Sequence, residues 1–179
     1  MMMLHPWGLE ASSSSYSVLG ELTVSGSRFC ICWQLSGDLS SFVIPKCSSS
    51  PFKLLEPNRK NELWKETCFE FFIRPKGQER YWEFNLSPSG KWNLYSLAKY
   101  RDELVPSKDL IDGEVSVDGS NQLYKITASL NAPELAKSPF MYNLTCVLQC
   151  AGQKTLFFAP RHPKTKPDFH DPSCFLNYE

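Results

Sequence analysis

The sequence predicts an all-β protein with very little helix, built as an antiparallel β-sandwich or barrel. Apolar and polar residues alternate with period two through most of the chain. Clusters of Gly, Pro, Asn, Asp and Ser separate the alternating runs and define about eight to ten short strands. Helical periodicity is confined to short connections, which excludes a helix bundle or an α/β fold.

The chain length predicts one domain preceded by a tail. A chain of 179 residues suits a single hydrophobic core. Residues 1–17 are rich in Ser and lack periodicity, so we expect a flexible N-terminal tail. The domain is predicted over residues 18–179. Its first clear strand places four apolar side chains on one face: Phe29, Ile31, Trp33 and Leu35.

The strongest strand signals lie in the middle of the chain. Residues 67–75 alternate between two largely apolar faces, one of which carries Glu70. Residues 81–88 have one apolar and one polar face. The Pro-Ser-Gly sequence at 88–90 is typical of a turn, and residues 91–97 resume the alternation. This pattern predicts a β-hairpin. Further strands are expected at 114–119, 123–130, 142–150, 154–160 and 174–178.

Charge and hydropathy exclude several classes of function. Lys plus Arg and Asp plus Glu both total 19, so the net charge gives no attraction for nucleic acid or an anionic membrane. No apolar run reaches the length of a membrane span. The N-terminus lacks the basic and apolar regions of a secretory signal, so a cytoplasmic protein is expected.

The seven cysteines fit the same compartment. Their number is odd, no Cys-x-x-Cys occurs, and four lie within strand-like apolar runs. We therefore expect reduced thiols that pack as small core residues, and neither disulfides nor a zinc site.

Three segments resemble a known family. They are NRKNELWKETCFEFFI (residues 58–73), YWEFNLSPSGKWNLYSLAKYR (81–101) and APRHPKTKPDFHDPSCF (159–175). Their order and spacing are similar to those of DOMON-like domains, which are related to family 9 carbohydrate-binding modules. The resemblance implies a jelly-roll-like β-sandwich over most of the chain. It also implies a binding function, since relatives bind sugars or, in some cases, haem.

Two tryptophans are candidates for contact with a ligand. Trp64 and Trp92 each lie at a strand end or beside a turn. A flat aromatic ring can bind the apolar C–H face of a sugar while polar groups bind its hydroxyls. The alternative is that either ring packs in the core, because Trp is commonly buried.

Two carboxylates and an amide on the central strands form the second candidate group. Glu70, Glu83 and Asn85 occur on strands that otherwise bury aromatic side chains, so each needs a partner or contact with water. On a concave face they would bind ligand hydroxyls. Otherwise Glu70 would form an ion pair with Arg59 or Arg161, and Asn85 would cap the following turn.

The third group lies near the C-terminus. His162, Asp168 and His170 fall within one proline-rich segment. They could brace one another, face a ligand, or gather a metal through two imidazoles and a carboxylate. No fourth donor is evident, so we predict no metal site and no cofactor.

These patterns favour a non-catalytic domain that binds a small polar ligand such as a carbohydrate. No nucleophile elbow or Gly-rich phosphate loop is present. Three alternatives remain open. One is a protein-interaction or structural domain without a small-molecule site. Another is a glycoside hydrolase using Glu70 and Glu83. The last is a haem domain with Met141 and His162 or His170 as axial ligands.

Overall fold

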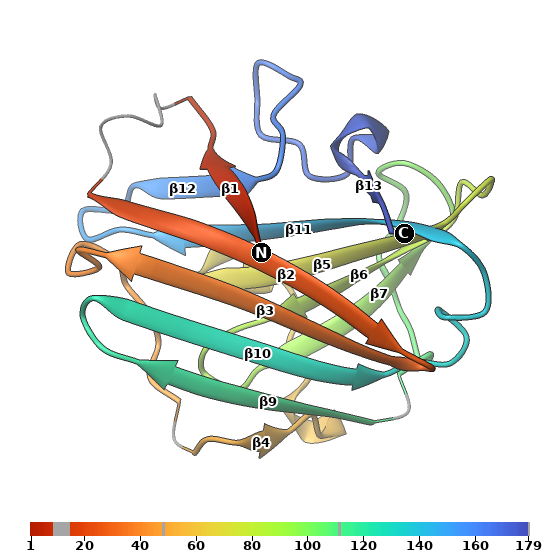
Figure 1. The fold of residues 1–179 in the computed structure, drawn as a ribbon, viewed down its shortest axis with the longest axis horizontal. Coiled ribbons are helices and arrows are strands. Elements are labelled where there is room, and N and C mark those ends of the chain that lie inside the picture. Colours follow the sequence, from red (N-terminus) through yellow and green to blue (C-terminus); the bar gives the residue numbers. More distant parts are fainter. Residues whose placement is uncertain (9–14, 48, 111, 179) are drawn as a thin grey trace.

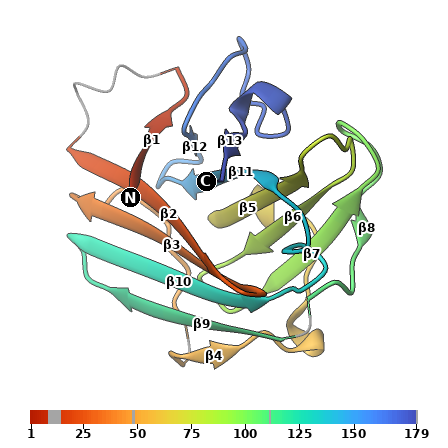
Figure 2. The ribbon, with the colours of Figure 1, turned by 45° about the vertical axis from the view of Figure 1, so that its right-hand side comes forward.

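Two antiparallel sheets pack face to face in the computed structural model, which describes residues 1–8, 15–47, 49–110 and 112–178 (Figures 1 and 2). The first sheet has the strand order β4-β9-β10-β3-β2-β1, and the second has β12-β11-β5-β6-β7-β8. The short strand β13 pairs with β11, and β1 pairs with both β2 and β12, so that it joins the two sheets.

The strands run as follows in the first sheet: β1 Met2–Pro6, β2 Tyr16–Ser25, β3 Arg28–Gly37, β4 Phe52–Lys53, β9 Asp112–Gly119 and β10 Leu123–Asn131. Those of the second sheet are β5 Cys68–Pro75, β6 Tyr81–Leu86, β7 Trp92–Leu97, β8 Val105–Pro106, β11 Phe140–Gln149, β12 Thr155–Ala159 and β13 Leu176–Asn177. The chain crosses between the sheets after β4, β8 and β10, as in a jelly roll. The predicted all-β sandwich is confirmed.

Helical structure in the described part of the chain is limited to 3-10 turns of three residues. These are η2 (Glu56–Asn58), η3 (Leu63–Lys65) and η4 (Pro172–Cys174). Across the same residues, no helix is long and apolar enough to span a membrane.

The prediction of a flexible tail over residues 1–17 was wrong for the part that the structure describes. Residues 2–6 form β1, and β2 begins at Tyr16. Leu4 is buried in the space between the sheets and anchors β1 there. Leu4 is also the one buried residue in β1, so the strand is too short and too exposed to show alternation. Residues 9–14 of the predicted tail lie outside the described residues.

The inter-sheet core is built from the apolar face of each strand. The expected face of β3, which carries Trp33, meets the expected face of β5, which carries Phe69, with ring centroids 5.7 Å apart. Phe29 likewise packs against Phe71 at 5.9 Å. All four rings are at most 2% exposed, and burial of such a side chain contributes roughly 1.5–3 kcal/mol.

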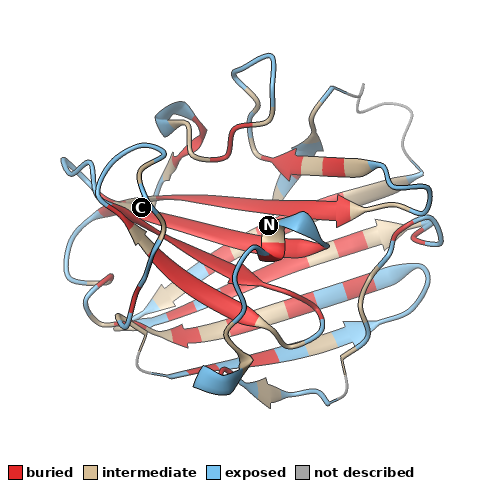
Figure 3. Cartoon of the chain, turned by 180° about the vertical axis from the view of Figure 1, so that it is seen from behind, coloured by how far each residue is buried: buried red, intermediate tan, exposed pale blue. Residues whose placement is uncertain are grey.

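The strands in the middle of the second sheet are buried more completely than those of the first sheet (Figure 3). Along β10, buried residues alternate with exposed or half-buried ones, because the outer face of the first sheet meets water. In contrast, all six residues of β6 and seven of the eight in β5 are buried. A second apolar cluster, separate from the inter-sheet core, covers the outer face of the second sheet. This covered face carries the candidate site.

Candidate ligand-binding site

A pocket of about 280 Å³ opens on the outer face of the second sheet. Its floor consists of strand residues: Glu70, Phe72, Glu83, Val147 and Phe157. Its walls come from three connecting segments that are far apart in sequence: Trp64; Arg101 and Leu104; and Pro167, Phe169 and His170. Ligand pockets are typically concave and mostly apolar, with few polar groups, and this pocket fits that description at the small end of their size range.

Strand register brings the two carboxylates of the floor together. Glu70 of β5 pairs across the sheet with Asn85 of β6, and Phe72 pairs with Glu83. Glu70 and Glu83 are therefore diagonal neighbours on one sheet face, and residues in that relation are roughly 7–8 Å apart, with their β-carbons somewhat closer. Both carboxylate side chains therefore belong to the floor of the pocket and project from the same sheet face.

Glu70 is 2% exposed and has one hydrogen-bond donor. Thr145 Oγ1, its cross-strand neighbour on β11, donates to Glu70 Oε2 over 2.8 Å. Burial, together with the nearby Glu83 charge, raises the pKa of Glu70 to about 8, although the Thr145 hydrogen bond opposes the rise. Glu70 thus holds a proton at neutral pH unless a cation joins it.

Glu83 is 3% exposed, and one of its oxygens lacks a partner. Asn85 Nδ2 donates to Glu83 Oε1 over 2.8 Å. Oε2 lies 3.8 Å from His170 Nε2, too far for a hydrogen bond. Burial raises the pKa of Glu83 to about 7, against the effects of the Asn85 hydrogen bond and the Arg101 charge. A buried acceptor of this kind is costly to leave unsatisfied.

His170 forms one wall and is held in the neutral state. Its Nδ1 lies 2.8 Å from the Tyr81 hydroxyl, and its ring packs edge-on against Phe72. Burial, with the Arg101 charge, lowers the pKa of His170 to about 4. His170 therefore offers no positive charge to the two glutamates at neutral pH.

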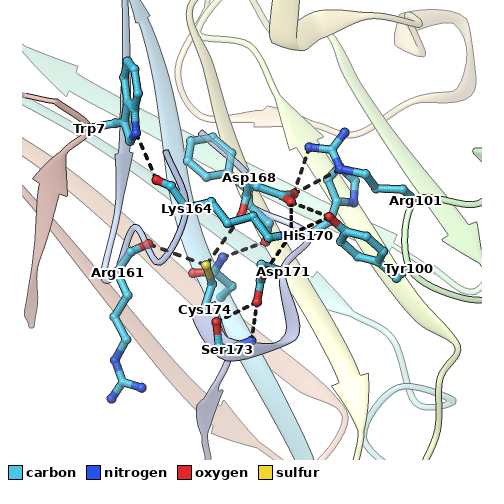
Figure 4. Close-up of polar contacts among 12 residues, drawn as sticks. Trp7, Tyr100, Arg101, Arg161, Lys164, Asp168, His170, Asp171, Ser173 and Cys174 are labelled. Atoms are coloured by element: carbon cyan, nitrogen blue, oxygen red, sulfur yellow. Dashed lines mark hydrogen bonds and ion pairs between the residues drawn. The ribbon is translucent and has the colours of Figure 1, made fainter. Parts of the chain in front are cut away.

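Asp168 fixes the C-terminal segment beside the pocket (Figure 4). Arg101 donates to Asp168 Oδ1 through Nε and Nη2, at 3.2 and 2.8 Å. Lys164 Nζ and the Tyr100 hydroxyl donate to Oδ2. Burial opposes ionisation of Asp168, but these hydrogen bonds outweigh it and lower its pKa to about 2. Lys164 also forms an ion pair with Asp171 at 2.8 Å.

Five of the seven predicted site residues lie in or beside the pocket. Trp64, Glu70 and His170 line it. Asn85 and Asp168 are buried next to it, where they hold Glu83 and Arg101 respectively. The alternative role of Asn85 as a turn cap is not observed, because its amide binds Glu83 rather than the turn.

Neither Trp92 nor His162 lines the pocket, contrary to the prediction, although the ring centroid of His162 lies 6.3 Å from that of the pocket residue Phe169. Trp92 is on the opposite face of β7, in the inter-sheet core, where its Nε1 donates to the Leu55 carbonyl over 3.0 Å. The Nε2 atom of His162 lies 2.7 Å from the carbonyl oxygen of His5, so this ring braces β1.

The ion pair predicted for Glu70 is absent as well. Arg59 instead bonds to Glu56 and Asn93, and neither it nor Arg161 forms an ion pair with Glu70. The C-terminal residues do not converge on a metal: within the described ranges, no three His, Cys, Asp or Glu side chains are grouped so as to hold one. Met141, the candidate axial ligand of the haem alternative, accepts a hydrogen bond from Arg74 on the neighbouring strand β5.

Sequence reasoning missed much of the pocket wall. Arg101, Leu104 and Phe169 lie in segments without regular structure, so no periodicity placed them. Phe72 and Phe157 do lie on strands, and the parity of β5 places Phe72 on the same face as Glu70. That parity was the available signal for Phe72.

Comparison with known proteins supports the fold. It is similar to the 2.70 Å crystal structure of a putative carbohydrate-binding protein from Bacteroides uniformis ATCC 8492, with a TM-score of 0.61 and 12% sequence identity. The similarity covers 97% of this chain and 83% of that one. No protein-family model matches the chain, and no curated protein matches it in sequence. At 12% identity the likeness concerns the fold alone.

Proposed function

We propose that this protein is a non-catalytic domain that binds a small polar ligand of the carbohydrate class in the pocket on the second sheet. The observation that carries the proposal is the buried oxygen of Glu83, which has no partner and lies in a pocket with aromatic walls. A hydroxylated ligand would donate to this oxygen and would place its C–H faces against Trp64 and Phe169. The structural similarity to a protein described as carbohydrate-binding agrees with this function.

Glycoside hydrolysis has less support than binding. Such enzymes need one carboxyl group protonated as the acid and a second one ionised as the nucleophile or base. Burial raises the pKa of Glu70 to about 8 and that of Glu83 to about 7, and among the described residues no Lys or Arg pairs with either group to keep it ionised. We therefore expect binding without turnover.

A protein-interaction role has less support. The exposed large apolar side chains are spread along the described chain from Met1 to Leu123, and the outer face of the second sheet holds a pocket rather than a flat surface. A binding screen in which no sugar binds would favour this role.

We extend the proposal to the family of the protein, its cellular location and the kind of partner it binds. The segments around Glu70, Asn85 and Asp168 support membership of the DOMON-like domains related to family 9 carbohydrate-binding modules. Seven free cysteines, four of them buried, support a reducing compartment and hence a cytoplasmic location. Balanced charge supports a partner that is neither nucleic acid nor membrane.

The test is a monosaccharide and glycan binding screen read by tryptophan fluorescence. We expect a saturable change in emission that disappears in Trp64→Phe and persists in Trp7→Phe, because Trp64 lines the pocket whereas Trp7 lies outside it. Nitrophenyl glycosides should release no nitrophenol. If no sugar in the screen binds, the proposed function is wrong, and glycoside cleavage abolished by Glu83→Gln would establish the hydrolase instead.

A further inference from the structure

The two floor carboxylates have no counter-ion of their own. Among the described residues, no Lys or Arg forms an ion pair with Glu70 or Glu83. Their remaining hydrogen-bond donors are neutral: the Thr145 hydroxyl and the Asn85 amide. Burial of an unpaired carboxylate is costly, so the ligand-free pair retains protons, and its ionisation requires a positive partner that the protein does not supply.

The charges nearest to the pair compensate one another. Arg101 lines the pocket, but two of its nitrogens bind Asp168. Lys164 binds both Asp168 and Asp171. This group contains two cations and two carboxylates and is neutral as a whole. Since the adjacent His170 is neutral, it does not supply the missing charge either.

Aromatic side chains in the floor and the walls of the pocket also suit a cation. Trp64, Phe72, Phe157 and Phe169 all line the pocket that contains the carboxylates. Aromatic faces attract ammonium groups, and the attraction is stronger where the groups are removed from water. The pocket volume of about 280 Å³ limits the ligand to about the size of one sugar ring.

We propose that the ligand is an amino sugar, whose protonated amine binds between Glu70 and Glu83 while its hydroxyls and ring contact the remaining walls. This inference rests on the proposed function and specifies the ligand of the same site. The amine supplies the positive charge that the protein omits and donates to the free oxygen of Glu83.

Release of a proton from the two glutamates should distinguish the binding of an amine from the binding of a neutral sugar. The groups that face the amine are Glu70, Glu83, Arg101 and His170. Burial keeps both glutamates largely protonated at pH 6, since their pKa values are raised to about 8 and about 7. A cation between them favours the ionised forms, so binding should release about one proton per ligand. A neutral sugar has no such effect.

Isothermal titration calorimetry of the full chain at pH 6 tests the inference with glucosamine, glucose and N-acetylglucosamine. We expect glucosamine to bind at least about tenfold more tightly than either neutral analogue. Titrations in two buffers with different ionisation enthalpies should show proton release for glucosamine alone. If a neutral sugar binds equally or more tightly, the amine assignment is overturned while the carbohydrate function stands. If none of the three binds, the amino sugar assignment is also overturned.

Variants separate charge recognition from structural support. Glu83→Gln keeps the shape of the side chain and an oxygen for the Asn85 amide but removes the charge. We expect it to weaken glucosamine binding by about tenfold and glucose binding by less than about threefold. The matched control, Glu114→Gln, changes an exposed residue on the outer face of the first sheet and should alter neither affinity. Equal weakening of both sugars by Glu83→Gln would assign Glu83 a structural role and overturn the inference.

Discussion

Glu83→Gln should stabilise the ligand-free protein at alkaline pH and have little effect at acid pH. The folded state raises the pKa of Glu83 from its ordinary value of 4.5 to about 7, chiefly through burial. Because folded Glu83 holds its proton more tightly than unfolded Glu83, stability falls as the pH rises from about 4.5 to about 7 and then levels off. Glutamine cannot ionise, so the variant escapes this loss.

The magnitude follows from the same values. A pKa difference between 4.5 and about 7 corresponds to about 3 kcal/mol of unfolding free energy at pH 8. The Glu83 charge also raises the pKa of Glu70, so its removal relieves part of the penalty on that group as well. For a chain of 179 residues, about 3 kcal/mol corresponds to a rise in Tm of about 6–12 °C.

Urea unfolding at pH 5, 6, 7 and 8, followed by far-ultraviolet circular dichroism, measures this effect. The stability of the variant relative to the wild type should increase across the series, because the neutral His170 affects the pH dependence of both proteins in the same way. The exposed control Glu114→Gln should follow the wild type. A variant whose stability relative to the wild type is no greater at pH 8 than at pH 5 would refute the reasoning.

Three further predictions concern Trp92 in the inter-sheet core and His170 and Asp168 at the pocket. Trp92→Phe removes the donor to Leu55 and should lower the unfolding free energy in urea by about 1–2 kcal/mol while sugar affinity is unchanged; lost affinity at full stability would contradict its core position. The His170 imidazole should remain neutral down to about pH 5 in nitrogen-15 NMR spectra, because burial lowers its pKa to about 4, and a midpoint above pH 6 would disprove this. Asp168→Asn should cost about 1–2 kcal/mol at neutral pH by weakening the hold on Arg101, and the deficit should close as the pH falls from about 4 to about 2. A deficit that persists at pH 2 would show that the carboxylate charge is not its cause.

The alternation of residues along a strand assigns each side chain to one of its two faces, so residues of the pocket floor could be predicted from sequence. In β5 the alternation assigns Glu70 and Phe72 to one face, and in β6 it assigns Glu83 and Asn85 to the polar face. What alternation does not supply is the register between strands. Diagonal placement of Glu70 and Glu83 depends on that register.

Trp92 and Arg101 show why the remainder was less accessible. Trp92 follows the alternation of β7, but deciding which face of β7 meets the first sheet requires the tertiary structure. Arg101 has a positive φ of 53° in a connection without periodicity. Its position depends on contacts with Tyr81 and Asp168, which lie 20 and 67 residues away in sequence.

Because β5 and β6 are buried on both faces, the floor of the pocket and its walls differ in how freely their residues can change during evolution. Every position on β6 contacts either the inter-sheet core or the pocket side, so a substitution there disturbs packing on one face or the other. The walls of the pocket instead belong to connecting segments, which tolerate insertion and exchange far better than strands. Divergence within this architecture should therefore change the size and outline of the accepted ligand first. The acidic character of the floor, which is fixed by the strands, should change last.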